Sequence, residues 1–209
     1  RRAFLDYTPV SPSASAEMFN SFNYGQLLDV FRIDLRSYRS PNSANTESAG
    51  DEGGHILGTK QLSWLKENLL RSKSVWKVIA SDMPLGLVVP DGADRFEGVA
   101  NGRAGAASGR EHEIANLLGY IKRMNIQNVV WVTADVHYAA AHYYDPTRAG
   151  FQDFNGFWEF VAGPLNAGTF GPNPLDMTFG PRVEFCSVPE GMVQNQPPSK
   201  GMQYYGMVS

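Results

Sequence analysis

The feature that most constrains the fold is a ten-residue run near the middle of the chain, residues 128–137. It begins with the apolar and β-branched side chains of residues 129–132 (Val-Val-Trp-Val), a pattern typical of a strand buried on both faces of a sheet. The run ends at Asp135 and His137, and both side chains are good metal ligands. Ligands bind at the carboxyl ends of strands in α/β sheets, so the run predicts a metal site where this strand enters its loop.

Several further segments accompany this run in a fixed order along the chain. They are residues 34–39, Leu57-Gly58 with Gln61, Trp64 and Leu65, then residues 76–84, 134–139 and 160–167. Together they resemble the C-terminal half of the alkaline phosphatase D family, within the calcineurin-like metallophosphatases. The resemblance spans roughly residues 1 to 182.

The resemblance implies an α/β (α+β) fold, a layered sandwich of sheet and helices with a multi-metal centre. The metals are typically Fe3+ with Ca2+, and the reaction is hydrolysis of phosphate mono- or diesters. By analogy with the superfamily, Asp135 would ligate one metal ion and His137 another, and both would serve catalysis. Relatives are usually exported, which implies a periplasmic or secreted protein.

One large part of the family pattern is absent from these 209 residues. The family's N-terminal half supplies an Asp-rich metal-binding segment and a turn that contains Asn and His. We therefore expect residues 1–209 to be the C-terminal portion of a metallophosphatase catalytic domain, with the N-terminal half of the same protein as its missing partner.

Asp82 is the third candidate metal ligand. It follows a short buried strand predicted over residues 76–81 and stands two residues before Pro84. The superfamily places a metal-binding histidine at this point, and an aspartate could replace it as an oxygen ligand for a hard cation. The alternative is that Asp82 caps the turn that follows it.

Two arginines are candidates for binding the substrate. A strand predicted over residues 28–35 has Asp34 and Arg36 pointing the same way, which favours a structural ion pair between them. The alternative is that Arg36 or Arg39 binds the substrate phosphate, because a guanidinium matches phosphate oxygens through two parallel hydrogen bonds.

The remaining pattern predicts two helices and two long loops. One helix runs from Thr59, as its N-cap, to about Arg71, and the other opens with a capping box formed by Ser108 and Glu111. Further strands are predicted over residues 18–24, 138–143 and 157–162. The loops cover residues 40–56 and 85–107; the second is expected to overhang the site, with Asp91, Asp94, Arg95 and Asn101 as possible contacts.

The other histidines and the cysteine have structural interpretations. His55 is expected at the surface, and His112 lies outside the apolar stripe of its helix and is expected in solvent. His142 is expected to pack in the core, on the face opposite to His137 if one strand carries both. Cys186 is the single cysteine, so an internal disulfide is excluded, and we expect a half-buried side chain at a strand end.

Composition and missing motifs exclude several classes of protein. The net charge of −3 argues against a nucleic-acid-binding module, and no apolar run reaches the roughly 18 residues of a membrane span. The chain contains neither a P-loop nor the G-x-S-x-G motif of serine hydrolases.

We therefore expect metal-dependent hydrolysis of phosphate esters by a metal-activated hydroxide, acting on a small phosphate ester or a phospholipid headgroup. Asp135, His137 and Asp82 supply at most three ligands, so this chain alone should bind metal weakly and turn over little. Two alternatives stay open: a phospholipase D-like phosphodiesterase on the same fold, and a non-catalytic scaffold with the metallophosphatase fold.

Overall fold

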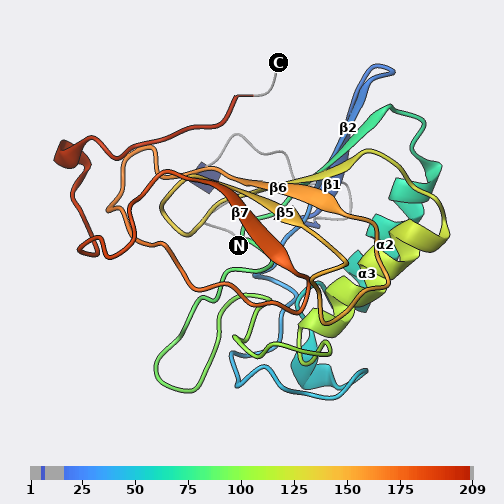
Figure 1. Ribbon diagram of the computed structural model, residues 1–209. Coiled ribbons are helices and arrows are strands. Elements are labelled where there is room, and N and C mark those ends of the chain that lie inside the picture. Colours follow the sequence, from blue (N-terminus) through green and yellow to red (C-terminus); the bar gives the residue numbers. More distant parts are fainter. Residues whose placement is uncertain (1–5, 8–16, 208–209) are drawn as a thin grey trace.

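The computed structural model describes residues 6–7 and 17–207, and in this part seven strands form one mixed sheet (Figure 1). The strands are β1 Asn20–Tyr24, β2 Leu28–Arg32, β3 Trp76–Ala80, β4 Val129–Thr133, β5 Ala140–Tyr144, β6 Phe157–Val161 and β7 Pro181–Cys186. Their order across the sheet is β1-β2-β3-β4-β6-β5-β7. β2, β3, β4 and β6 run parallel to one another, whereas β1 and β5 run antiparallel to their neighbours. The expected α/β class is confirmed.

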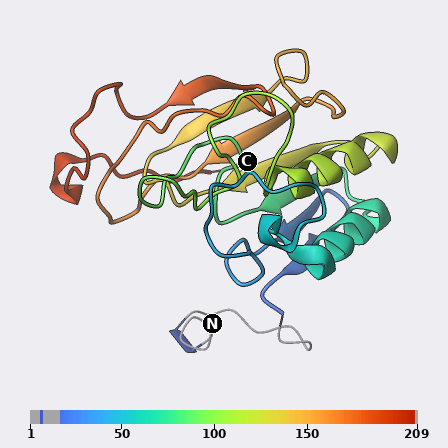
Figure 2. The ribbon, with the colours of Figure 1, turned by 90° about the horizontal axis from the view of Figure 1, so that it is seen from below.

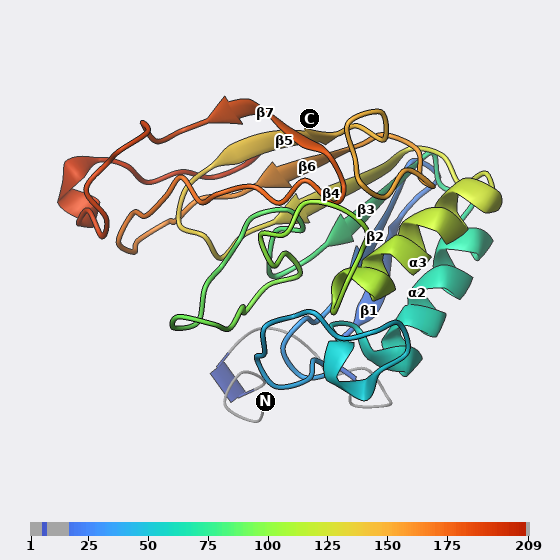
Figure 3. The same cartoon turned by 60° about the horizontal axis from the view of Figure 1, so that its bottom comes forward.

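Two long α-helices lie side by side on one face of the sheet (Figure 3). They are α2 Gly58–Arg71 and α3 Glu111–Arg123, accompanied by the short 3-10 turns η1 Glu52–Gly54 and η2 Pro198–Lys200. Apolar side chains at helical spacing, such as Leu65 and Leu69 of α2 and Leu117 of α3, pack on Trp131 and other inward residues of the strands. None of the helices among the described residues is long and apolar enough to cross a membrane.

The start of α2 differs from the prediction. The helix begins at Gly58, so Thr59 lies inside its first turn and is not the N-cap. The carboxylate of Glu113 in α3 accepts hydrogen bonds from the backbone N–H groups of Ile56, Leu57 and Gly58 at 2.8, 2.6 and 3.2 Å. A carboxylate there satisfies the free N–H groups of a helix start and favours its positive end, so a side-chain cap from Thr59 is not needed.

The same carboxylate explains where His55 lies. The side chain of His55 is partly exposed, and its Nδ1 lies 2.7 Å from Glu113 Oε1. Glu113 therefore uses both oxygens to hold the segment that leads into α2.

The start of α3 shows half of the predicted capping box. Glu111 Oε2 accepts the N–H of Ser108 at 3.0 Å, as the box requires. Ser108 Oγ accepts instead from the side-chain amide of Asn101 at 2.9 Å. The hydrogen bond between Asn101 and Ser108 ties the long loop of residues 85–107 to the start of the helix that follows it.

The two faces of the sheet are not covered alike. On β4, Trp131 is fully buried under the helices, but Val130 and Val132 on the other face are only partly buried. Their neighbours on β6, Trp158 and Phe160, are 38% and 43% exposed. The prediction of a strand buried on both faces is therefore wrong for the described residues, because both helices cover the same face.

Candidate metal and phosphate site

The candidate site lies at the carboxyl edge of the parallel strands. Because β2, β3 and β4 are parallel and adjacent, their carboxyl ends meet at one edge of the sheet. The chain leaves these strands at Ile33, Ser81 and Ala134, so Asp34, Asp82 and Asp135 follow at equivalent points.

Asp135 and His137 lie in a tight turn with unusual backbone geometry. Both residues have positive φ angles, 74° and 66°, in the left-handed region that non-glycine residues rarely adopt. Val136 between them is buried, and its N–H donates to the carbonyl of Ala134 at 3.0 Å. Such backbone strain is found most often at functional sites.

The imidazole of His137 is held by one backbone contact. Its Nδ1 lies 2.6 Å from the carbonyl oxygen of Gly168, which only accepts, so Nδ1 carries the hydrogen. Nε2 is then left with a lone pair, as metal-binding histidines require. The ring also packs edge-on against Phe170, with 5.3 Å between the ring centroids.

His142 has the structural role that was predicted for it. It is buried in β5, and its Nδ1 lies 3.0 Å from the buried Glu159 carboxylate. The expectation that His137 and His142 lie on opposite faces of one strand does not apply, because β5 begins only at Ala140 and does not include His137. Cys186 ends β7 and is half-buried, as predicted.

Asp82 links two strand ends. Its Oδ1 accepts the N–H of Leu35 at 3.0 Å, so this oxygen bonds to the segment after β2. Burial raises the pKa of the Asp82 carboxyl, and the hydrogen bond from Leu35 opposes that rise. The Asp82 carboxylate thus lies at the carboxyl edge of the sheet, where it could bind a cation and Leu35 at the same time.

Asp34 does not form the ion pair with Arg36 that was predicted as one alternative. Its Oδ1 accepts the backbone N–H groups of Arg36 and Ser37 at 2.8 and 2.9 Å and closes the turn after β2. Its Oδ2 is buried without a hydrogen-bond partner among the described residues. Sequence reasoning did not count Asp34 as a ligand, although it follows a strand at the same edge as Asp82.

Arg36 and Arg39 meet at one carboxylate, that of Glu97. Arg36 Nη1 bonds to Glu97 Oε1, and Arg36 Nη2 lies 3.5 Å from Asp135 Oδ1. Arg39 Nη2 lies 3.3 Å from the same Glu97 oxygen, and its Nη1 donates to the Glu97 carbonyl at 2.8 Å. Burial raises the pKa of Asp135, against the lowering effect of Arg36.

Glu97 reaches this position because the two long loops lie side by side, as Figures 2 and 3 show. The N–H of Phe96 donates to the carbonyl of Ser43 at 2.9 Å across the loops. Arg110 lies between them, fully buried. Its guanidinium donates to the carbonyls of Phe96, Glu97, Gly98, Ser40 and Pro41 and to Oδ1 of Asn42.

Three of the four predicted contacts in the 85–107 loop have other partners, and the fourth, Asp94, is exposed. Asn101 is 3% exposed and donates to the carbonyl of Asn45 at 2.7 Å, so it stabilises the loop from inside. Asp91 accepts from Asn42 at 2.9 Å and pairs with Arg95 at 3.6 Å. Glu97, which the sequence analysis missed, is the loop residue at the site, and no local pattern distinguishes it from the other acidic residues of the loop.

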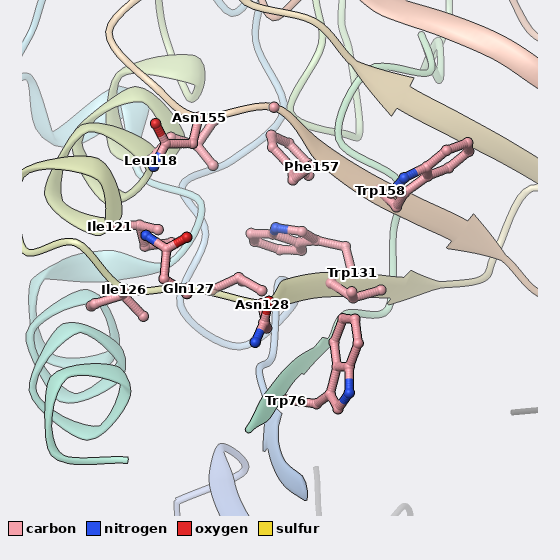
Figure 4. Close-up of a pocket in the computed structure, with 13 residues that line it drawn as sticks. Trp76, Leu118, Ile121, Ile126, Gln127, Asn128, Trp131, Asn155, Phe157 and Trp158 are labelled. Carbon is pink, nitrogen blue, oxygen red and sulfur yellow. The ribbon is translucent and has the colours of Figure 1, made fainter. Parts of the chain in front are cut away.

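Two hollows lie at opposite edges of the sheet. One, about 440 Å³ in volume, is lined by Asp34, Asp82, Arg36 and Arg32 at the carboxyl edge. The other, about 250 Å³, lies at the amino ends of β4 and β6, where Trp131 and Phe157 face Gln127 and Asn155 (Figure 4). No charged side chain lines the second hollow. The first hollow adjoins the candidate site through Arg36 and Asp82, and Asp135, His137 and Glu97 are not part of its lining.

The types of residue present suit a metal ion, but too few of them surround one point. Carboxylate oxygens and an imidazole nitrogen suit iron and calcium, and the unpartnered Oδ2 of Asp34 is a carboxylate oxygen free to bind a cation. In the part of the chain that the structure describes, no group of three or more His, Cys, Asp or Glu side chains is placed to hold one ion. The edge thus offers part of a coordination shell.

Comparison with known proteins places the chain in a family. It is 25% identical to alkaline phosphatase D of Bacillus subtilis (strain 168) over 191 residues, which cover 81% of this chain and 30% of that protein. The fold matches a solved structure of PhoD with a TM-score of 0.55 and 22% identity, over 80% of this chain and 34% of that one. The chain thus spans about a third of the length of these relatives. The sequence profile of the PhoD-like phosphatases matches residues 1–209, and the chain therefore belongs to the PhoD-like phosphatase family.

Proposed function

We propose that this chain forms one edge of the active site of a metal-dependent phosphate-ester hydrolase of the alkaline phosphatase D type. The observation that carries the proposal is the contact between Arg36 and Asp135, which joins a potential phosphate-binding guanidinium to a potential metal-binding turn. Phosphoryl transfer needs positive charge around the phosphate group, and here a guanidinium and a bound metal ion would both supply it.

Asp135, His137 and Asp82 would hold the metal ions, which we take to be Fe3+ and Ca2+ from the family resemblance. Bound there, the ions would supply Lewis acidity that lowers the pKa of water and offsets phosphoryl charge. The chain's own contribution is orientation: the Gly168 carbonyl fixes the ring of His137, and Asp135 and His137 stand two residues apart in a turn with positive φ angles.

Arg36 and Arg39 would bind the phosphoryl oxygens. A guanidinium donates two parallel hydrogen bonds to such a group and stays charged at any working pH. Both arginines already bond to an anionic oxygen, Oε1 of Glu97, so each guanidinium is placed to accept an anion.

This chain matches only about a third of the length of its relatives, and this partial match supports a second proposal. Residues 1–209 would form the C-terminal portion of a larger catalytic domain, whose other part completes the coordination shell. By the same resemblance the protein would be periplasmic or secreted, and a phospholipase D-like phosphodiesterase or a non-catalytic scaffold are the alternative functions.

The experiment is hydrolysis of p-nitrophenyl phosphate and bis-p-nitrophenyl phosphate by the protein that contains this chain, with Asp135→Asn and His137→Ala as variants. We expect either variant to lower kcat/KM at least about 100-fold, with Glu67→Gln, at an exposed position of α2, as a control of unchanged rate. Full activity of both variants would refute the site. Activity on the diester alone would favour the phosphodiesterase, and a wild type inactive on both esters would favour the scaffold.

A further inference from the structure

Glu97 lies where a substrate phosphate would have to lie. Its Oε1 bonds to Arg36 and lies 3.3 Å from Arg39 Nη2, so one oxygen is shared by both guanidiniums. An anion that binds to these arginines must either displace this carboxylate or bind beside it.

The carboxylate cannot leave the neighbourhood, because its backbone is fixed on three sides. The Glu97 N–H donates to the carbonyl of Val89 at 2.8 Å. The Glu97 carbonyl accepts from Arg39 at 2.8 Å and from the buried Arg110 at 2.9 Å. Rotation of the side chain therefore moves the negative charge by only a few ångströms, on the order of the length of the side chain itself.

The charges of this cluster are balanced before any substrate arrives. Arg36 and Arg39 carry two positive charges, and Glu97 faces them with one negative charge while Asp135 adds a second beside Arg36. The side chains of Arg39 and Glu97 are only 14% and 26% exposed, so water does not fully screen them.

We propose that Glu97 is a specificity-determining residue, whose fixed carboxylate favours singly charged phosphodiesters over doubly charged phosphomonoesters at this site. The inference rests on the proposed role of Arg36 and Arg39 in binding phosphate. A monoester loses its second proton near pH 6 and is a dianion at pH 8, whereas a diester stays a monoanion. Both ligands form the same hydrogen bonds with a guanidinium, but Glu97 repels the dianion twice as strongly.

The test compares two ligands that differ by one methyl group, methyl phosphate and dimethyl phosphate. Their dissociation constants are measured by isothermal titration with this chain at pH 8, in buffer with chelator so that only the protein's own charges act. In Glu97→Gln we expect dimethyl phosphate to bind about threefold more tightly and methyl phosphate about tenfold more tightly, because doubling the ligand charge squares the factor.

Two controls separate this charge effect from other changes. Asp91→Asn removes a charge from the same loop without touching Arg36 or Arg39, and both dissociation constants should stay within about twofold of wild type. Glu97→Ala should likewise increase the affinity for methyl phosphate more than the affinity for dimethyl phosphate. It replaces Glu97→Gln if that variant does not fold.

The outcomes distinguish the two levels of the proposal. An equal gain for both ligands in Glu97→Gln would overturn the specificity role and leave phosphate binding by the arginines intact. Failure of wild type and variant to bind either ligand would overturn the phosphate-binding role itself, and the specificity role with it.

Discussion

Nδ1 of His137 and the carbonyl oxygen of Gly168 lie 2.6 Å apart, although 31 residues separate them in the chain. The loop after β6 thereby fixes the tautomer of a histidine in the loop after β4. A Cβ on Gly168 would lie 2.1 Å from Oδ1 of the exposed Asn195, so a larger residue there would have to displace that side chain. The position of His137 therefore depends on two segments that bring no ligand of their own.

This contact predicts the proton distribution of one ring. At pH 8 the neutral His137 should carry its hydrogen on Nδ1 and leave Nε2 unprotonated. The two ring nitrogens have distinct 15N shifts, and a two-bond 1H–15N spectrum of labelled protein assigns the tautomer. An Nε2–H tautomer in wild type would contradict the orientation described above.

Metal binding by the chain alone should be weak. In the described ranges, residues 6–7 and 17–207, no three acidic, histidine or cysteine side chains are placed around one point. We expect a dissociation constant for Ca2+ on the order of 1 mM or weaker, lost in Asp135→Asn. Isothermal titration that finds tight stoichiometric binding would show that the site is complete without further residues.

Arg110 should be the most sensitive position for stability near the site. Arg110→Met leaves its carbonyl acceptors in both long loops without their donor, and these lie in buried or part-buried surroundings. We expect a loss of about 3 kcal/mol or more in the free energy of unfolding, measured with urea. The matched control is Arg103→Met, an exposed arginine of the same loop, for which we expect a change within about 0.5 kcal/mol.

Glu111 should make stability depend on pH. Burial raises the pKa of its carboxyl from 4.5 to about 8, and the nearby Asp176 adds to the rise. A pKa raised by folding means that the stabilisation is full below about pH 4.5 and is lost as the pH rises through about 8. Melting temperatures from pH 5 to pH 9 should fall in wild type, and Glu111→Gln should flatten this dependence. An equal slope in both proteins would assign the pH effect to other groups.

Local patterns were enough to predict the main strands and helices and the sheet edge at which Asp82 and Asp135 lie. The apolar run before Asp135 and the amphipathic stripe of α3 depend on side chains a few residues apart, which a sequence displays directly. Parallel neighbouring strands then place Asp82 and Asp135 at one edge, as expected from their positions at strand ends.

The features that escaped prediction depend on contacts between distant segments. Thr59 has the chemistry of an N-cap, but a carboxylate from α3 is nearer to the free N–H groups of α2. Glu97 resembles the other acidic residues of its loop until the buried Arg110 fixes the backbone on which it stands. The open face of β4 and β6 likewise follows from where both helices pack, which no single strand encodes.

The position of the Glu113 carboxylate has a consequence for how the protein unfolds locally. It belongs to α3, yet it holds the amide protons of Ile56, Leu57 and Gly58 at the start of α2. Those protons can exchange with solvent only after the two helices separate at this end, so the first turn of α2 cannot fray independently. The helical layer should then open as one cooperative unit, with a common rate of deuterium uptake at both helix starts.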